Sequence, residues 1–192
     1  MTSKLKTDVL ETVSGSGTIA LTNQLSGMTS ASVPSGSVLQ IVGHLSTTQT
    51  SQTSSTSDAV VADLSKAITP LGANSKFLIA VRWFGEAGNA HDCLFNIQMN
   101  GTRVNVNGGG RGYGLSAPAL SYAHSDHSST PETTSFQTLV STSSVIGTAI
   151  TFRLVFDNYG VHTMFTNRTK DLNASSNHEL GTSELIITEI KG

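Results

Sequence analysis

Short runs that alternate apolar and polar residues, separated by turn-forming residues, extend over most of this chain. The run at residues 149–156 places Ile150, Phe152, Leu154 and Phe156 at every second position, which is the period of a half-buried β-strand. No stretch of similar length shows the 3.6-residue period of an amphipathic helix. The pattern therefore predicts an all-β protein.

The other predicted strands are rich in β-branched and apolar residues and are bounded by glycine, proline or polar turns. Residues 76–84 form the most hydrophobic run, so we expect this strand at the centre of a sheet. Residues 46–57 are almost all Ser, Thr and Gln and are predicted to be extended and exposed. So many short strands, with no alternation of strand and helix, favour an antiparallel β-sandwich of jelly-roll type, or a barrel. The remaining strands are predicted at residues 38–42, 58–64, 67–69, 136–140, 163–166 and 184–190.

The most specific local prediction is a β-hairpin at residues 95–106, with the sequence FNIQMNGTRVNV. Its turn is Asn100-Gly101, because these two residue types adopt positive φ at little cost. The turn fixes the register, and the apolar pairs expected on one face are Ile97 with Val104 and Phe95 with Val106. The polar residues expected on the other face are Asn96, Gln98 and Asn105.

Residues 1–35 differ in character from the rest of the chain. Two short β-like runs are separated by the turn-forming SGSG at residues 14–17, and neither run has enough apolar residues to bury itself. We therefore predict an extended N-terminal anchoring arm and linker at residues 1–35, followed by a β domain at residues 36–192. An arm of this kind adds its strands to the sheet of another protein. The arm residues expected to be buried by docking are Leu5, Val9, Leu10, Val13, Ile19 and Leu21.

Composition and charge exclude some functions. Charged residues make up only 12% of the chain, and eleven basic against thirteen acidic residues give a formal net charge of −2. The missing basic excess argues against a nucleic-acid partner. The longest apolar run, residues 77–81, is far too short for membrane insertion. The first residues contain no apolar signal segment, so we expect synthesis in a cytoplasm.

No motif predicts a catalytic, cofactor or metal site. The lone Cys93 lies in a strand-like segment and is predicted to be a small buried residue. The NGGGRGYG segment at residues 107–114 lacks the Gly-Lys-Ser/Thr and the helix of a phosphate loop, so we predict a surface loop, with ligand contact at its tip left open. The HSDH segment at residues 124–127 is predicted to be a polar loop, and a metal at a symmetry axis stays an open alternative.

Enzymatic chemistry has little support in the pattern. The chain has no Gly-x-Ser-x-Gly motif. Its thirteen acidic residues are scattered, and so many acids would supply candidate carboxylate pairs by chance in any protein. We therefore predict that the protein is not an enzyme. Trp83 lies in the most apolar strand, so a place in the core or in a subunit interface is favoured over sugar stacking. The residues available for glycoside cleavage are the carboxylates Glu86, Asp92, Glu132 and Asp157, and those available for stacking on sugar rings also include Tyr113, Tyr122 and Tyr159.

Five segments, taken in order, carry a resemblance to a known class of proteins. They are SKLKTDVLETVSGSGTIAL (residues 3–21), SGSVLQIV (35–42), ITPLGANSKFLIAV (68–81), FTNRT (165–169) and ELIITEIKG (184–192). In this order and combination they resemble virion structural proteins of tailed bacteriophages, especially marine and cyanobacterial ones. Such proteins are described as tail fibres, capsid fibres or capsid decoration (cement) proteins.

The resemblance implies a short anchoring arm followed by a jelly-roll domain that assembles as a homotrimer, without catalytic residues. Many relatives carry a long shaft between anchor and tip, whereas this chain has only residues 23–37 there. This difference favours a compact decoration or capsid-fibre protein on the virion surface, docked to the major capsid protein or another virion protein. The alternative is a tail fibre or receptor-binding module that recognises host surface glycans through residues 108–114 and 124–134.

Overall fold

The computed structural model describes the part of the chain that follows the predicted arm. The chain divides into two units, residues 1–33 and residues 34–192, and all the strands belong to the second. The arm residues Leu5, Val9, Leu10, Val13, Ile19 and Leu21 lie outside the described residues, so their docking role stays a prediction. The described residues are 30, 32–54, 57–87, 93–106, 113–118, 130–158, 160–171 and 179–192.

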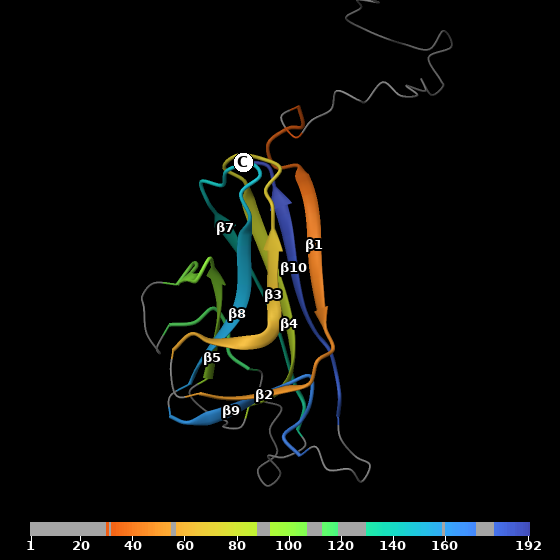
Figure 1. The fold of residues 1–192 in the computed structure, drawn as a ribbon, viewed down its shortest axis with the longest axis vertical. Coiled ribbons are helices and arrows are strands. Elements are labelled where there is room, and N and C mark those ends of the chain that lie inside the picture. Colours follow the sequence, from red (N-terminus) through yellow and green to blue (C-terminus); the bar gives the residue numbers. More distant parts are fainter. Residues whose placement is uncertain are drawn as a thin grey trace, which may run out of the picture. The chain divides into compact units, whose positions relative to one another are not determined.

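Every regular element in these ranges is a β-strand, and the strands form two antiparallel sheets (Figure 1). In the first sheet the order is β1-β10-β4-β9-β2, and β7 also pairs with β4; in the second sheet it is β3-β8-β5-β6. The predicted all-β, antiparallel class is therefore confirmed. The strands are β1 (Val38–Ser46), β2 (Thr50–Ser54), β3 (Ala59–Ile68), β4 (Lys76–Ala87), β5 (Cys93–Met99), β6 (Thr102–Arg103), β7 (Glu132–Ser141), β8 (Ile150–Asn158), β9 (His162–Thr166) and β10 (Ser183–Ile190).

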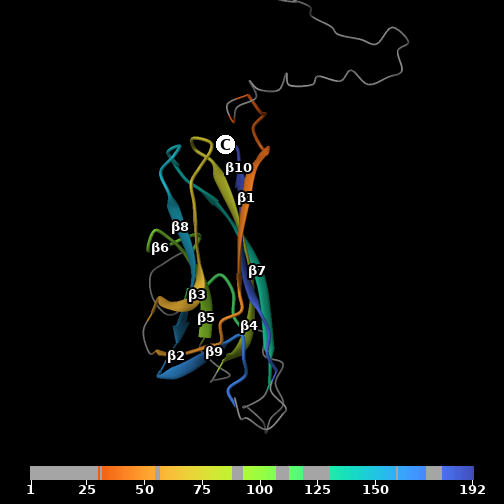
Figure 2. The same cartoon turned by 45° about the vertical axis from the view of Figure 1, so that its right-hand side comes forward.

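The two sheets face each other as a β-sandwich, and the hydrophobic core fills the space between them (Figure 2). Phe77 of β4 packs against Phe152 of β8, with ring centroids 5.5 Å apart. Trp83 of β4 packs against Phe95 of β5, with centroids 5.1 Å apart. All four side chains are completely buried, so the alternating apolar positions of both sheets supply the main driving force for folding.

Strand β4 lies at the centre of the first sheet, as its apolar run predicts. One of its edges pairs with β7, and the other pairs first with β10 and then with β9. Trp83 is a core residue, and its indole N–H donates to the Thr166 hydroxyl at 3.0 Å. At Gly85 a Cβ atom would overlap the backbone carbonyl of Phe165, so only glycine allows β9 to approach here.

The hairpin has the predicted turn and the predicted register beside it. Asn100 and Gly101 both have positive φ, 49° and 87°, as a two-residue hairpin turn requires. The N–H of Val104 donates to the carbonyl of Ile97 at 3.0 Å, which confirms the first apolar pair. The predicted polar face is confirmed for Asn96 and Gln98 of β5, both of which are buried under further polar contacts. It is wrong for Asn105, whose amide donates to the Thr138 hydroxyl and the Leu139 carbonyl of β7 in the first sheet, both at 2.7 Å.

The second predicted pair of the hairpin, Phe95 with Val106, is wrong. Asn105 adopts a left-handed conformation with φ of 56°, and the strand β6 has already ended before it. Phe95 instead forms a bridge with Ser116, whose carbonyl accepts the Phe95 N–H at 2.7 Å. A later segment therefore occupies the place that the hairpin pattern assigned to its own second strand.

Of the segment predicted to be extended at residues 46–57, the structure describes residues 46–54 and 57, and residues 50–54 form β2, paired with β9. The expectation that it is exposed throughout is wrong at Ser46, which is fully buried. Asn167 explains the burial, because its side-chain amide donates to the hydroxyl of Ser46 at 2.9 Å and to its carbonyl at 3.1 Å. A buried polar residue of this kind needs a hydrogen-bond partner from elsewhere in the chain.

The strands predicted at residues 58–64 and 67–69 form one strand, β3, with a bulge in it. The register of β3 against β8 shifts between Val60 and Ser65, and Asp63 within this stretch has φ of 61°. A bulge bends a strand and changes the direction of its side chains. On both sides of the bulge β3 stays paired with β8.

Candidate functional site on the outer face of the second sheet

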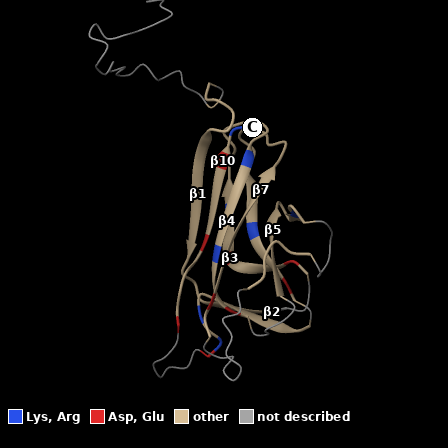
Figure 3. Ribbon diagram, turned by 180° about the vertical axis from the view of Figure 1, so that it is seen from behind, with Lys and Arg blue, Asp and Glu red and all other residues tan. Residues whose placement is uncertain are grey.

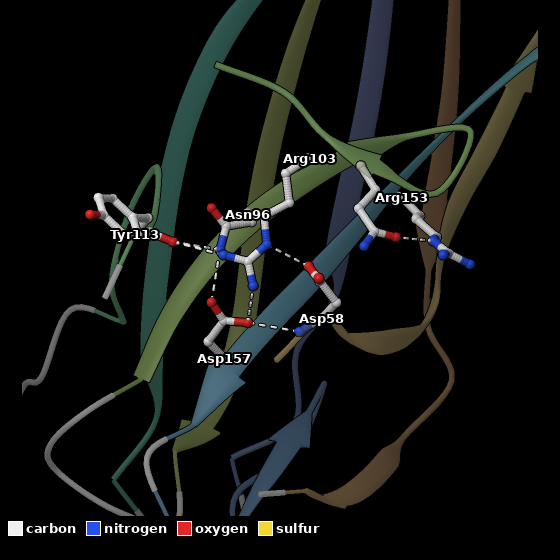
Figure 4. Close-up of polar contacts among 7 residues, drawn as sticks. Asp58, Asn96, Arg103, Tyr113, Arg153 and Asp157 are labelled. Carbon is white, nitrogen blue, oxygen red and sulfur yellow. Dashed lines mark hydrogen bonds and ion pairs between the residues drawn. The ribbon is translucent and has the colours of Figure 1, made fainter. Parts of the chain in front are cut away.

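A group of polar and charged side chains lies on the face of the second sheet that points away from the core (Figure 4). Strand alternation explains the placement, because the core residues of β5 and β8 are separated by polar residues that point outward. We name this group the outer cluster. Its members are Asp58, Asn96, Gln98, Arg103, Arg153 and Asp157.

Arg103 is held between two carboxylates. Its Nε–H donates to Asp58 at 2.6 Å, and a terminal nitrogen donates to Asp157, also at 2.6 Å. The side chain of Arg103 is only 8% exposed and that of Asp157 is 1% exposed. Burial disfavours the charge of Arg103, but the hydrogen bonds to both acids outweigh it and raise the pKa of the guanidinium. Arg103 is therefore charged and fully engaged.

The acids are positioned by further hydrogen bonds. The backbone N–H of Asp58 donates to Asp157 at 2.7 Å, and the Asn96 amide donates to the second oxygen of Asp157 at 3.3 Å. The same amide donates to the backbone carbonyl of Tyr113 at 3.1 Å. The Oδ1 atom of Asn96 is buried and has no hydrogen-bond donor within reach among the described residues. An unpaired buried acceptor of this kind costs about 1–3 kcal/mol.

Arg153, the second arginine of the outer cluster, has a different environment. The registers of β3, β8, β5 and β6 place Ser65, Arg153, Gln98 and Arg103 in one row across the sheet. The Nε–H of Arg153 donates to the neutral Gln98 side chain at 2.7 Å. Within the described ranges, no acidic side chain lies within ion-pair distance of Arg153. A groove of about 310 Å³ lies beside it, lined by Ser65, Asn100, Gly101, Thr151 and Arg153.

Two of the carboxylates weighed from the sequence lie near each other at the end of β4. Glu86 is 2% exposed and accepts the backbone N–H of Lys170 at 2.6 Å; Glu132 is 5% exposed and accepts that of Ala87 at 3.2 Å. Burial, and the nearby negative charge of Glu86, raise the pKa of Glu132 to about 7. The candidate Asp92 lies outside the described residues.

Cys93 is buried, as predicted. Burial, followed by the negative charges of Glu132 and Asp157, raises the pKa of its thiol to about 12, so the thiol is protonated at neutral pH. Tyr113 is 46% exposed and contributes its backbone carbonyl to the outer cluster. The candidate segments 107–112 and 124–127, and the aromatic residues Tyr122 and Tyr159, lie outside the described residues.

Within the described ranges, no group of three or more His, Cys, Asp or Glu side chains is placed to hold a metal ion. No helix long and apolar enough to cross a membrane occurs in the same ranges.

The sequence did not single out a fourth buried carboxylate, Glu189, on the inner face of β10. Burial disfavours its charge, but hydrogen bonds from the Ser75 hydroxyl, the Gln40 amide and the N–H groups of Leu71 and Gly72 lower its pKa. Glu189 thereby ties the β3–β4 turn to β10 and β1. In the sequence it alternates with Leu185 and Ile187 on one face of the strand, but no pattern identifies its distant partners Ser75 and Gln40.

Comparison with the models of known protein families found no match to this chain, and comparison with curated proteins found none either. The outer cluster and the groove are therefore interpreted from their own geometry.

We expect Arg103→Met to destabilise the protein by about 3 kcal/mol or more, because it leaves the buried Asp157 without its cation. Arg153→Gln removes the same charge from the same row of the sheet, where no acid depends on it, and should cost less than about 1 kcal/mol. Urea unfolding of both variants measures the difference. Equal losses would show that the two arginines have the same structural role.

The pKa of Glu132 predicts a pH dependence of stability. Its pKa rises from 4.5 in the unfolded chain to about 7 in the folded protein, so the folded state binds the proton more tightly. The free energy of unfolding should therefore fall as the pH rises from about 4.5 to about 7, by about 3 kcal/mol from this group.

The variant Glu132→Gln has no ionisable group at this position, so it should lose this part of the pH dependence. Its free energy of unfolding should therefore fall less between pH 5 and pH 8 than that of the wild type. Urea unfolding across this pH range tests the expectation. The control Glu184→Gln alters a half-buried acid of β10, and its slope should match that of the wild type. A wild-type slope retained in Glu132→Gln would contradict the assignment.

Proposed function

We propose that this protein is a non-enzymatic structural component of a bacteriophage virion. In this proposal the β domain is jelly-roll-like, assembles as a homotrimer and docks to the major capsid protein or another virion protein through residues 1–35. It acts at the particle surface as a decoration (cement) or capsid-fibre protein. Two things support the proposal: the five segments that resemble such proteins, and an uncovered apolar face on the first sheet.

That face, which we name the outer apolar face, is formed by β1, β10, β4 and β7. The registers place Ile41, Thr188, Leu78 and Leu139 in one row across the four strands. Ile41 is 63% exposed and Leu139 is 48% exposed, although both are apolar residues within strands of the sheet. Val38, Leu45, Ala80, Ile186 and Ile190 extend the face to neighbouring rows. Exposed apolar sheet surface of this kind is typical of an interaction site.

The charge of this face favours a second copy of the chain as its partner. Charged side chains are sparse along these strands (Figure 3), and those that point outward are Lys76, Arg82 and Glu184. Arg82 is already engaged with Thr182, whose carbonyl accepts at 2.7 Å. The whole chain has a formal net charge of only −2, so two copies repel each other little. Symmetric contacts between copies would cover the apolar rows.

The second candidate is a tail fibre or receptor-binding module that recognises host surface glycans. The polar groove beside Arg153 favours it, because an open groove of about 310 Å³ is near the size of small-ligand sites. Antibody labelling of intact particles separates the two candidates. Label over the head supports a decoration role, whereas label confined to the tail supports receptor binding.

The outer apolar face predicts an oligomer that a single charge disrupts. Light scattering of the wild-type protein should give three chain masses, and Ile41→Asp or Leu139→Asp should shift the mass toward one chain, because the burial of an unpaired carboxylate is costly. The control Val161→Asp alters an equally exposed residue outside this face, 70% exposed in the β8–β9 turn, and should remain trimeric. A monomeric wild type would contradict the assembly proposal.

The docking role of the arm predicts a separate effect. A chain that lacks residues 1–35 should fold and keep its oligomeric mass but no longer join particles, because the arm supplies the strands that pair with the partner. Incorporation into purified particles measures this effect. Normal incorporation of the truncated chain would exclude the arm as the anchor.

A further inference from the structure

We propose that the groove beside Arg153 binds an oxyanion, a carboxylate or sulfate group carried by a ligand from solution. The proposal does not rest on the virion function, since the groove lies on the second sheet and the outer apolar face on the first. Figure 4 shows the guanidinium of Arg153 turned away from the Asp58–Arg103–Asp157 group.

The first argument is the contrast between two arginines of one row. Arg103 has two carboxylates at 2.6 Å, so its charge is more than balanced. Arg153 has a neutral oxygen, that of Gln98, at 2.7 Å on its Nε. This contact fixes the plane of the guanidinium and leaves its terminal nitrogens without an anion among the described residues. A planar, pre-oriented guanidinium is well suited to bind an oxyanion through two parallel hydrogen bonds.

The second argument is the orientation of Asn100 at the rim of the groove. The backbone N–H of Thr151 donates to Asn100 Oδ1 at 2.9 Å, and the Asn100 N–H donates back to the Thr151 carbonyl, also at 2.9 Å. Because a backbone N–H must meet an oxygen, the first bond fixes which end of the amide is which. The NH₂ end of Asn100, which lines the same groove as Arg153, is thereby left as a donor without a partner among the described residues.

The third argument is the composition and access of the groove. Its lining combines the Arg153 guanidinium with the Asn100 amide and the hydroxyls of Ser65 and Thr151, and it includes no carboxylate. Such a set favours an anion over a cation. A Cβ on Gly101 would lie 3.8 Å from a terminal nitrogen of Arg153, so the bare glycine keeps one side of the guanidinium open. The hairpin turn holds Asn100 and Gly101, and the paired strands β3 and β8 hold the other lining residues, before any ligand arrives.

The test uses the full ¹⁵N-labelled chain and follows the amide signals of Gly101 and Thr151 by NMR at constant ionic strength. The probes are sodium sulfate and sodium glucuronate, with sodium chloride as the background salt. We expect saturable shifts of both signals with at least one probe. Arg153→Gln should weaken binding at least tenfold, and Arg153→Lys, which keeps the charge but loses the planar fork, should weaken it several-fold.

Arg82→Gln is the matched control, because it removes the same charge from a half-buried arginine on the first sheet and should bind like the wild type. Equal affinities for sulfate and glucuronate would identify a small free oxyanion as the ligand, and at least tenfold tighter binding of glucuronate would identify an acidic saccharide. Shifts that do not saturate, or wild-type affinity in Arg153→Gln or in Arg153→Lys, would overturn the proposal.

Discussion

The burial of one face of β4 against β8 and β5 is the constraint on which the rest of the domain depends. Phe77 and Trp83 meet aromatic rings of the second sheet only if β4 stays paired along both of its edges. Gly85 then becomes necessary, because β9 joins β4 where a side chain would overlap the Phe165 carbonyl. With the inner faces committed to the core, whatever the domain recognises has to meet its outer faces or its loops.

The two outer faces differ in their chemistry. The first sheet presents half-exposed aliphatic rows with few charges, a surface that gains free energy when another protein covers it. The second sheet presents hydrogen-bonded ionic groups, and Arg103 neutralises part of the acidic charge that Asp58 and Asp157 place there. Arg153, two strands away, is left with a neutral partner. We therefore interpret one face as a surface for assembly and the other as a surface for a small polar ligand.

Sequence reasoning predicted those features that depend on neighbours along the chain. The Asn100-Gly101 turn fixed the first pair of the hairpin, and the apolar run identified β4 as a central strand. The outer cluster was not predictable in this way, because Arg103 meets acids 45 and 54 residues away in the chain. A two-residue period assigns polar residues to a face, but the register between the strands determines which of them meet. The wrong pairing of Phe95 has the same origin, since the left-handed Asn105 is a local departure from an otherwise regular pattern.

The pairing of β1 with β10 also bears on how the protein is made. Val38, at the start of the first strand, lies opposite Ile190, at the end of the last. The hairpin around residue 100 needs only neighbouring residues and is free to form early, whereas β1 has no strand partner until β10 has left the ribosome. During synthesis the aliphatic residues of β1 therefore remain without their sheet until β10 has been made. The first sheet is consequently completed late, only after β10 has been synthesised, and crowding by other nascent copies would act on this interval.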